Sequence, residues 1–128
     1  MSADSALTVE MSDLDGYAVV AAAGSVDTLT HPVLAEHLGR AIEATRLAVI
    51  VDMSGVHFCD SSGLNAFARA DMRAGSRGIS LIAAGLQDRV HRVFTTTGIV
   101  HGVYLMSDVH SAVRWLETGT NGPALYLT

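Results

Sequence analysis

The sequence predicts an α/β fold, a single domain with a mixed β-sheet that is opened by an antiparallel hairpin and packed with about four helices. Two β-like runs come first, at residues 6–11 and 17–24, and the Asp and Gly residues of SDLDG between them favour a hairpin turn. A continuous apolar run at 47–55 has the length of a strand that is buried on both faces. Helical and strand-like patterns then alternate, as expected for parallel strands joined by crossover helices.

The first two helices are predicted from apolar residues that recur at helical spacing. The first helix is expected at about 31–45, where Thr30 can cap the N-terminus and Pro32 is tolerated in the first turn. The second is expected to begin near Ser62 and to end at residue 75 or 78. Their apolar faces are predicted to comprise Val33, Leu34, Leu38, Ala41 and Ile42 in the first helix and Leu64, Phe67, Ala68 and Met72 in the second.

The second half of the chain is predicted to hold two more strands and two more helices. The strands are expected at 79–84 and 103–106, and the helices at 86–98 and 107–117, the last with a Ser/Asp cap. Trp115 is interpreted as a core or rim aromatic rather than an exposed anchor. The apolar stripes are predicted to comprise Val90, Val93 and Phe94 in the third helix and Val109, Val113 and Leu116 in the fourth.

Length and composition limit the class of protein. The 128 residues predict one domain, 1–128, with its core at about 7–116 and a tail at 118–128 whose order the sequence leaves open. Hydrophobic residues make up 49% of the chain and aromatic residues only 5%, so the core must be aliphatic. No apolar run approaches the roughly 20 residues that cross a bilayer, and MSADSALTVE has no signal-peptide pattern. We therefore expect a cytoplasmic protein with no membrane contact.

Charge and cysteine usage exclude further classes. The net charge is −5, and the eight basic residues, all arginine, are scattered along the chain. A nucleic-acid-binding protein would carry a dense basic face with stacking aromatics, so we expect no direct contact with nucleic acid. Cys59 is the single cysteine and cannot form an internal disulfide. Its apolar surroundings favour a small buried hydrophobe over a nucleophile.

The segment DSSG at residues 60–63 has two interpretations. It lies where the chain leaves a predicted central strand and begins a helix, a junction at which ligands and modifications concentrate. In the first interpretation Asp60 or Ser61 simply caps the helix by accepting hydrogen bonds from its first free N–H groups. In the second, a serine here is a phosphoacceptor, because a helix N-terminus tolerates the negative charge of a phosphate.

The longer segment VHFCDSSGL, residues 56–64, resembles the hallmark of STAS domains. This family comprises the anti-sigma factor antagonists and shares its fold with a domain of sulphate transporters. RVFTTTGI, residues 92–99, resembles a later helix-ending segment of the same family, and the order of elements matches over about 7–116. The resemblance implies a STAS-like α/β domain that regulates a sigma factor and is not an enzyme.

The resemblance also implies site residues and partners. The serine directly after the aspartate, here Ser61, is phosphorylated in the family by an anti-sigma factor that is also a serine kinase, and ATP is bound by that partner. The unphosphorylated antagonist binds the anti-sigma factor and releases the sigma factor, and a PP2C-type phosphatase resets it. The family carries Gly-Glu-(Leu/Ile)-Asp before the first helix; in GSVD, residues 24–27, Asp27 matches and Ser25 replaces the glutamate. The partner-binding surface is expected to comprise Asp27, Asp60, Ser62, Gly63 and Leu64.

In this interpretation Asp60 orients Ser61 for the kinase, and Gly63 lets the backbone of the partner approach. The protein is expected to be a monomer or weak dimer. The alternative is a STAS module that is never phosphorylated and serves as a structural subunit of a stressosome-like or lipid-transport assembly.

Enzyme and metal-site interpretations find little support in the residues. Ser61 or Ser62 as a nucleophile would need a base, but the chain lacks the Gly-x-Ser-x-Gly elbow and none of its six histidines is placed by sequence to serve either serine. The nearest histidine pairs lack the i, i+4 spacing of a helical zinc site. There is no lysine and no Walker-type loop. We therefore expect no catalytic residue, no metal and no cofactor.

Arginines recur along the second predicted helix. Arg69, Arg73 and Arg77 are spaced to line one face of it. A solvated face is the default interpretation. The alternative is that these arginines help to meet an acidic kinase surface, because they border the helix that carries Ser61.

Overall fold

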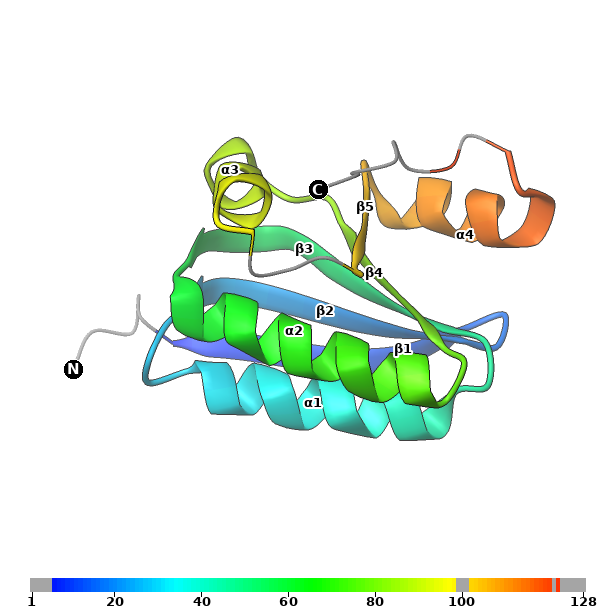
Figure 1. Cartoon of the computed structure of the whole chain (residues 1–128), viewed down its shortest axis with the longest axis horizontal. Coiled ribbons are helices and arrows are strands. Elements are labelled where there is room, and N and C mark those ends of the chain that lie inside the picture. The colour runs from blue at the N-terminus through cyan, green and yellow to red at the C-terminus, as the bar shows by residue number, and fades with distance from the viewer. Residues whose placement is uncertain (1–5, 99–101, 121, 123–128) are drawn as a thin grey trace.

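The computed structural model describes residues 6–98, 102–120 and 122, which form a five-stranded sheet with four helices (Figure 1). The elements follow the predicted alternation along the chain. They are β1 (Leu7–Leu14), β2 (Tyr17–Val26), α1 (His31–Ala44), β3 (Ala48–Cys59), α2 (Ser61–Ser76), β4 (Ser80–Ala84), α3 (Asp88–Thr96), β5 (Tyr104–Met106) and α4 (Val109–Thr118).

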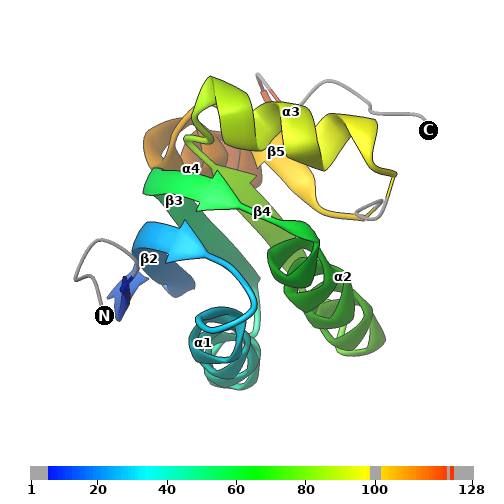
Figure 2. The same ribbon diagram turned by 90° about the vertical axis from the view of Figure 1, so that its left-hand side faces the viewer.

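The sheet is mixed, as predicted. Its strands lie in the order β1-β2-β3-β4-β5, with β1 antiparallel to β2 and every other pair parallel. The helices α1 and α2 lie on one side of the sheet and α4 lies on the other, while α3 packs on the same core cluster as α1 and α2 (Figures 1 and 2). No helix in these described residues is both long enough and apolar enough to cross a membrane.

Two clusters of buried apolar side chains form the core. The larger joins α1 and α2 to one face of the sheet and includes α3, because Phe94 of α3 reaches Phe67 of α2 with ring centroids 5.1 Å apart in an edge-to-face arrangement. The smaller packs α4 against the opposite face around Ile50 and Ile82. Trp115 lies at the rim of this second cluster and contacts Tyr104, with centroids 4.9 Å apart, which confirms its predicted role.

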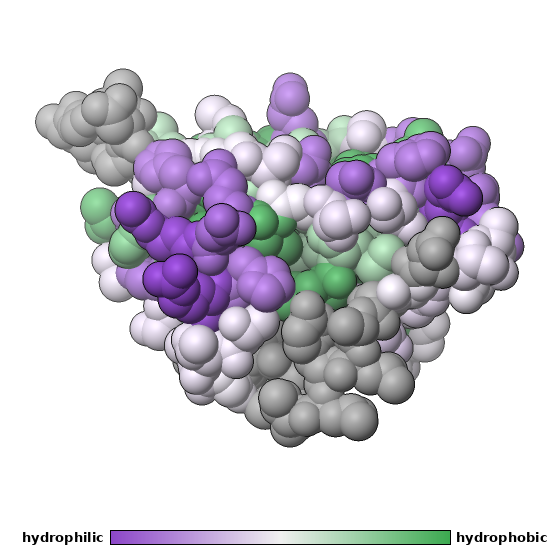
Figure 3. All heavy atoms as spheres, turned by 90° about the horizontal axis from the view of Figure 1, so that it is seen from above, coloured by the Kyte–Doolittle hydropathy of each residue, from purple (hydrophilic) through white to green (hydrophobic). Residues whose placement is uncertain are grey.

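Apolar surface is exposed between α3 and α4 in the view from above (Figure 3). A hollow of about 260 Å³ lies next to α3 and β5 and is lined by Leu86, His91, Leu105, Met106 and Ser107.

Strand β3 is longer than predicted. The sequence pattern ended it at residue 55, but it continues to Cys59 because β2 pairs with it through two register shifts, so that Ser25 lies opposite Phe58. Gly55 is not a strand end. A Cβ atom at Gly55 would come within 2.8 Å of the Cβ of Ala23, so the glycine permits the close approach of the two strands.

The inner faces of the helices also differ from the prediction in two places. Met72 is 76% exposed, and the inner face of α2 continues through Ala70 and Ala74 instead. Val33 of α1 is 39% exposed, whereas the other four predicted positions of that helix are fully buried. The helix α4 has the predicted cap, because the Asp108 carboxylate accepts a hydrogen bond from the backbone N–H of Ser111. The predicted tail lies outside the described residues except for 118–120 and 122.

Replacing Phe67 by alanine tests the assignment of the larger core cluster. Phe67 is fully buried and contacts Phe94, so Phe67→Ala should lower the free energy of unfolding by about 3–5 kcal/mol in urea denaturation. Met72→Ala, in the same helix but exposed, is the matched control and should change it by no more than about 0.5 kcal/mol. Similar losses for the two variants would contradict the packing described here.

Candidate functional site

The candidate site lies where β2 and β3 end and the helices α1 and α2 begin (Figure 2). Both helices start at this end of the sheet, so their N-termini lie close to one another. The backbone N–H of Asp60 donates to the carbonyl oxygen of Val26 over 3.1 Å, which ties the start of α2 to the end of β2. This hydrogen bond brings the loop of Asp27 and the DSSG segment together, as the family resemblance implied for the two motifs.

Asp27 organises the loop before α1. Its carboxylate accepts hydrogen bonds from the backbone N–H groups of Leu29 (2.9 Å) and Thr30 (3.0 Å). These bonds, that from Leu29 foremost, lower the pKa of Asp27 below its ordinary value, because they favour the charged carboxylate. Thr30 was predicted to cap α1, but its side chain makes no capping hydrogen bond. Its hydroxyl instead donates to the carbonyl oxygen of Ser25 (2.7 Å) and accepts from the backbone N–H of Asp27 (2.9 Å).

Asp60 caps α2, which confirms one of the two capping residues that the sequence suggested. Its backbone is extended, and its carboxylate accepts a hydrogen bond from the backbone N–H of Ser62 (2.9 Å). The Ser62 hydroxyl donates to the same carboxylate oxygen. Ser61 is exposed, and its hydroxyl makes no hydrogen bond within the part of the chain that the structure describes. The two adjacent serines therefore differ, because within the described ranges the hydroxyl of Ser62 is hydrogen-bonded and that of Ser61 is not.

Gly63 and Leu64 were expected on the docking surface, but the structure buries both. A Cβ atom at Gly63 would come within 2.5 Å of the sulfur of Cys59 and 2.7 Å of a methyl group of Val26. The glycine therefore lets the first turn of α2 pack onto the ends of β2 and β3. Leu64 is fully buried in the larger core cluster. Neither residue therefore presents a side chain at the surface around Ser61.

Cys59 is a buried residue of the core, as predicted. It is 4% exposed, and burial, aided by the charge of Asp60, raises the pKa of its thiol to about 12. A thiol of this kind is not a nucleophile near neutral pH. Within the described residues, no group of three or more His, Cys, Asp or Glu side chains could hold a metal ion.

Exposed apolar side chains at the site escaped the sequence analysis. Leu29 is 76% exposed in the loop that Asp27 organises, and Phe58 is 42% exposed near the end of β3, two residues before Asp60. Phe58 lies opposite Ser25 in the pairing of β2 with β3. Ser25, which stands where the resembled family has a glutamate, is itself buried. The sequence does carry a signal for them, because Leu29 follows Asp27 by two residues and Phe58 precedes Asp60 by two.

Comparison with known proteins identifies the family. The family model of the STAS domain matches residues 8–112. The chain is 31% identical over 120 residues to the anti-sigma-F factor antagonist RsfB of Mycobacterium tuberculosis, which covers 93% of this chain and 97% of the relative. It is 29% identical over 94 residues to the anti-sigma-B factor antagonist of Listeria monocytogenes, covering 73% of this chain and 82% of the relative. The chain belongs to the STAS domain family.

A solved structure agrees with this assignment. The structure of an anti-sigma factor antagonist from Mycobacterium paratuberculosis superposes with a TM-score of 0.75 at 28% sequence identity and covers 91% of this chain and 99% of the other. The predicted fold class and the family resemblance are thus confirmed.

The contact beneath Ser61 can be tested with a pair of glycines in one helix. Gly63→Ala should lower the free energy of unfolding by about 1–3 kcal/mol, because the new methyl group overlaps Cys59 and Val26. Gly75→Ala is the control, since a Cβ at Gly75 meets nothing within 4 Å, and alanine should raise stability by roughly 0.5–1 kcal/mol through helix propensity. Stabilisation by both substitutions in urea unfolding would contradict the close packing at Gly63.

The hydrogen bonds of Asp27 predict a pH dependence of stability. Because its pKa is lower in the folded protein than the ordinary 3.8, the stability that the carboxylate contributes is fully present above that value. It should be lost as the pH falls through the lower pKa of the folded state. Urea unfolding between pH 7 and pH 3 should therefore show Asp27→Asn less stable than the wild type near neutral pH, with the difference shrinking in acid. Glu10→Gln, at an exposed position, serves as the control. A difference in stability between Asp27→Asn and the wild type that stays constant with pH would contradict the hydrogen bonding assigned to the Asp27 carboxylate.

Proposed function

We propose that this protein is an anti-sigma factor antagonist whose binding is switched by phosphorylation of Ser61. Its unphosphorylated form binds an anti-sigma factor that is also a serine kinase and so releases a sigma factor. Phosphorylation turns this binding off, and a PP2C-type phosphatase restores it. The protein itself is not an enzyme, binds no ATP and acts as a monomer or weak dimer. The names of the relatives, all anti-sigma factor antagonists, support the regulatory class.

The observation that carries the proposal is the difference between the two serines. A kinase needs an exposed hydroxyl that can reach its active site. Ser61 is exposed and its hydroxyl is free within the described residues, whereas the hydroxyl of half-buried Ser62 is held by the Asp60 carboxylate. This contrast favours Ser61 as the phosphoacceptor on physical grounds, and the family position of the serine after the aspartate agrees with it.

The position at the start of α2 allows phosphorylation without unfolding. A phosphate adds about −1.5 to −2 charges, and a helix N-terminus stabilises negative charge. The side-chain cap of this helix is already supplied by Asp60 through Ser62, so the helix does not depend on the Ser61 hydroxyl. The folded structure should thus persist, while the charge of the surface around Ser61 changes strongly.

The exposed apolar residues explain why such a charge would switch binding. Leu29 lies between β2 and α1 and Phe58 lies two residues before Asp60, and a partner that covers these exposed side chains must displace water from their surroundings. A phosphate at Ser61 resists that loss of water, because burying an unpaired charge is costly. The carboxylates of Asp27 and Asp60 lie at the same site and add like charge. We infer that Asp27, Asp60 and Ser62 shape the docking surface, with Gly63 and Leu64 supporting it from inside.

The switch can be tested with purified proteins. Each anti-sigma factor of the host would be titrated with the wild type, Ser61→Ala and Ser61→Glu by isothermal calorimetry. Ser61→Ala should bind the cognate factor like the wild type, and Ser61→Glu should bind about tenfold more weakly or worse, because it places a charge in the interface. Ser12→Glu, which makes the same change at an exposed position of β1 far from the end of β2 that forms the site, is the control and should bind normally.

Mass spectrometry of the protein from its own host would complete this test, with the phosphate localised to Ser61 or to Ser62. Equal binding by the three Ser61 forms would refute the switch. A peptide that stays unmodified under all growth conditions would instead favour a structural subunit of a larger assembly.

A further inference from the structure

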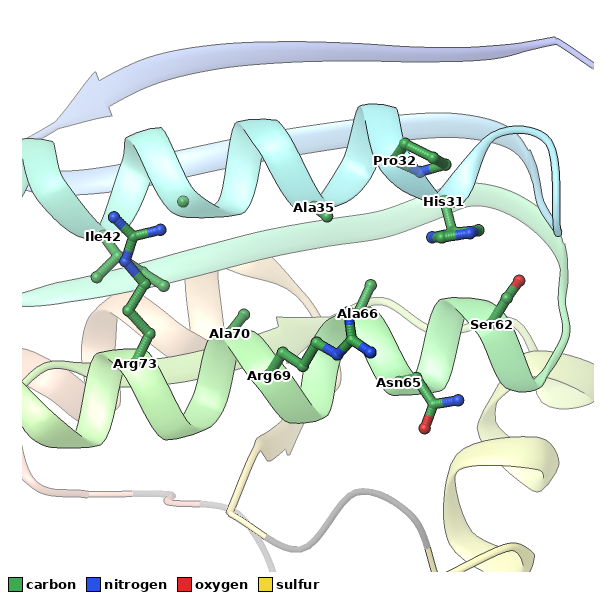
Figure 4. A pocket seen from close by; sticks show the side chains of 11 residues that line it. His31, Pro32, Ala35, Ile42, Ser62, Asn65, Ala66, Arg69, Ala70 and Arg73 are labelled. Carbon is green, nitrogen blue, oxygen red and sulfur yellow. The ribbon is translucent and has the colours of Figure 1, made fainter.

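A groove of about 580 Å³ runs between α1 and α2, on the side of the sheet that these helices cover (Figure 4). Small and apolar side chains of both helices, among them Pro32, Ala35, Ala66 and Ala70, form much of its lining. Along α2 the groove extends from Ser62 to Arg73, which corresponds to about 16 Å at the helical rise per residue. An extended peptide covers that length with about five residues.

The ionisable side chains that line the groove are all basic. They are Arg69, Arg73 and His31, and no Asp or Glu belongs to the lining. This composition is unusual for the chain, which has 13 acidic and eight basic residues and a net charge of −5. The groove therefore concentrates positive charge on an acidic protein, and its complement is an anionic partner.

The two arginines differ in their pairing. Arg73 extends across Gly39 to form an ion pair with Glu43 of α1, so its charge is partly neutralised, and it closes one end of the groove. Arg69 lies one turn closer to Ser61 and has no ion pair or hydrogen bond of its side chain among the described residues. Its guanidinium lies along α2 beside Ala66 (Figure 4). Among the described residues, Arg69 is thus a cation without a side-chain partner in the middle of the groove.

The groove is continuous with the site of Ser61. Ser62 lines its other end, with the ring of His31 facing it from α1 (Figure 4). Asn65, also in the lining, is one helical turn after Ser61 and so lies on the same side of α2. A partner that covers Ser61 can therefore continue into the groove without leaving the surface.

We propose that the groove between α1 and α2 is a second docking surface, which takes an extended acidic segment of the anti-sigma factor and holds it by Arg69. This rests on the proposed function for the identity of the partner. The groove adds specificity for charge, whereas Ser61 and the exposed apolar residues provide the switch. Because Arg69 is solvent-exposed, part of its contribution is screened by salt.

Reversal of the charge of Arg69 tests the proposal on the complex. Arg69→Glu should weaken binding of the cognate anti-sigma factor by about tenfold or more at low ionic strength, with a smaller loss at high ionic strength, and Arg69→Gln should show an intermediate loss. The control is Arg114→Glu, which makes the same change at an exposed position of α4, on the other side of the sheet, and should leave the affinity unchanged. Equal effects of Arg69→Glu and Arg114→Glu would overturn the proposal.

A peptide titration tests the groove without the anti-sigma factor. An octapeptide of glutamate and leucine, added to the isotopically labelled protein, should shift the backbone amide signals of Gly39, Asn65 and Ala66 in NMR spectra. The shifts should disappear in Arg69→Glu, persist in Arg114→Glu and be absent with the peptide in which lysine replaces glutamate. Inorganic phosphate that shifts the same signals at lower concentration than the peptide would overturn the proposal in favour of a small-anion site.

The two experiments separate this inference from the proposed function. If the Ser61 variants behave as expected but Arg69→Glu binds normally and the peptide shifts no groove signals, the groove inference fails and the switch stands. If no anti-sigma factor binds the wild type, the proposed function fails, and the assignment of the anti-sigma factor as occupant fails with it. The peptide titration then decides alone whether the groove takes acidic segments.

Discussion

The contact of Gly63 with Cys59 and Val26 determines how the two halves of the site meet. Because the glycine has no side chain, the first turn of α2 packs directly on the ends of β2 and β3. The hydrogen bond from Asp60 to the carbonyl of Val26 reinforces this contact. The loop of Asp27 leaves β2 one residue later, so its position follows from the same packing. A residue in the core of the protein therefore sets the geometry of an exposed surface.

Local patterns were sufficient to predict most of the fold. The bounds of α1, the buried central strand and the cap at Asp60 all depend on residues that are close in sequence. The prediction failed where contacts between segments that are distant in the sequence determine the structure. Gly55 has the features of a strand end when it is considered alone, but it is kept within β3 by the approach of Ala23 from β2. Met72 matches the helical spacing, yet α1 and β4 pack against α2 where the small Ala70 and Ala74 permit it.

The site was predicted less completely than the fold, because equivalent residues acquire different surroundings. Two adjacent serines are alike in the sequence, but the Asp60 carboxylate binds the hydroxyl of Ser62, whereas that of Ser61 has no hydrogen bond among the described residues. Arg69 and Arg73 are likewise one turn apart on one face, but only Arg73 is placed to pair with Glu43 of the neighbouring helix, and Arg69 has no ion pair among the described residues. The family resemblance indicated where the site lies, and these differences lie in side-chain contacts that no local pattern encodes.

The burial of Cys59 has a consequence for the kinds of signal that can act at this end of the molecule. Its thiol lies two residues from Ser61, but it is covered by the protein and its pKa of about 12 leaves almost no thiolate at neutral pH. Oxidants and electrophiles react with thiolates that are accessible. The only sulfhydryl group of the chain is therefore shielded from oxidants and electrophiles, so its position beside the site does not make the site a thiol-based redox sensor.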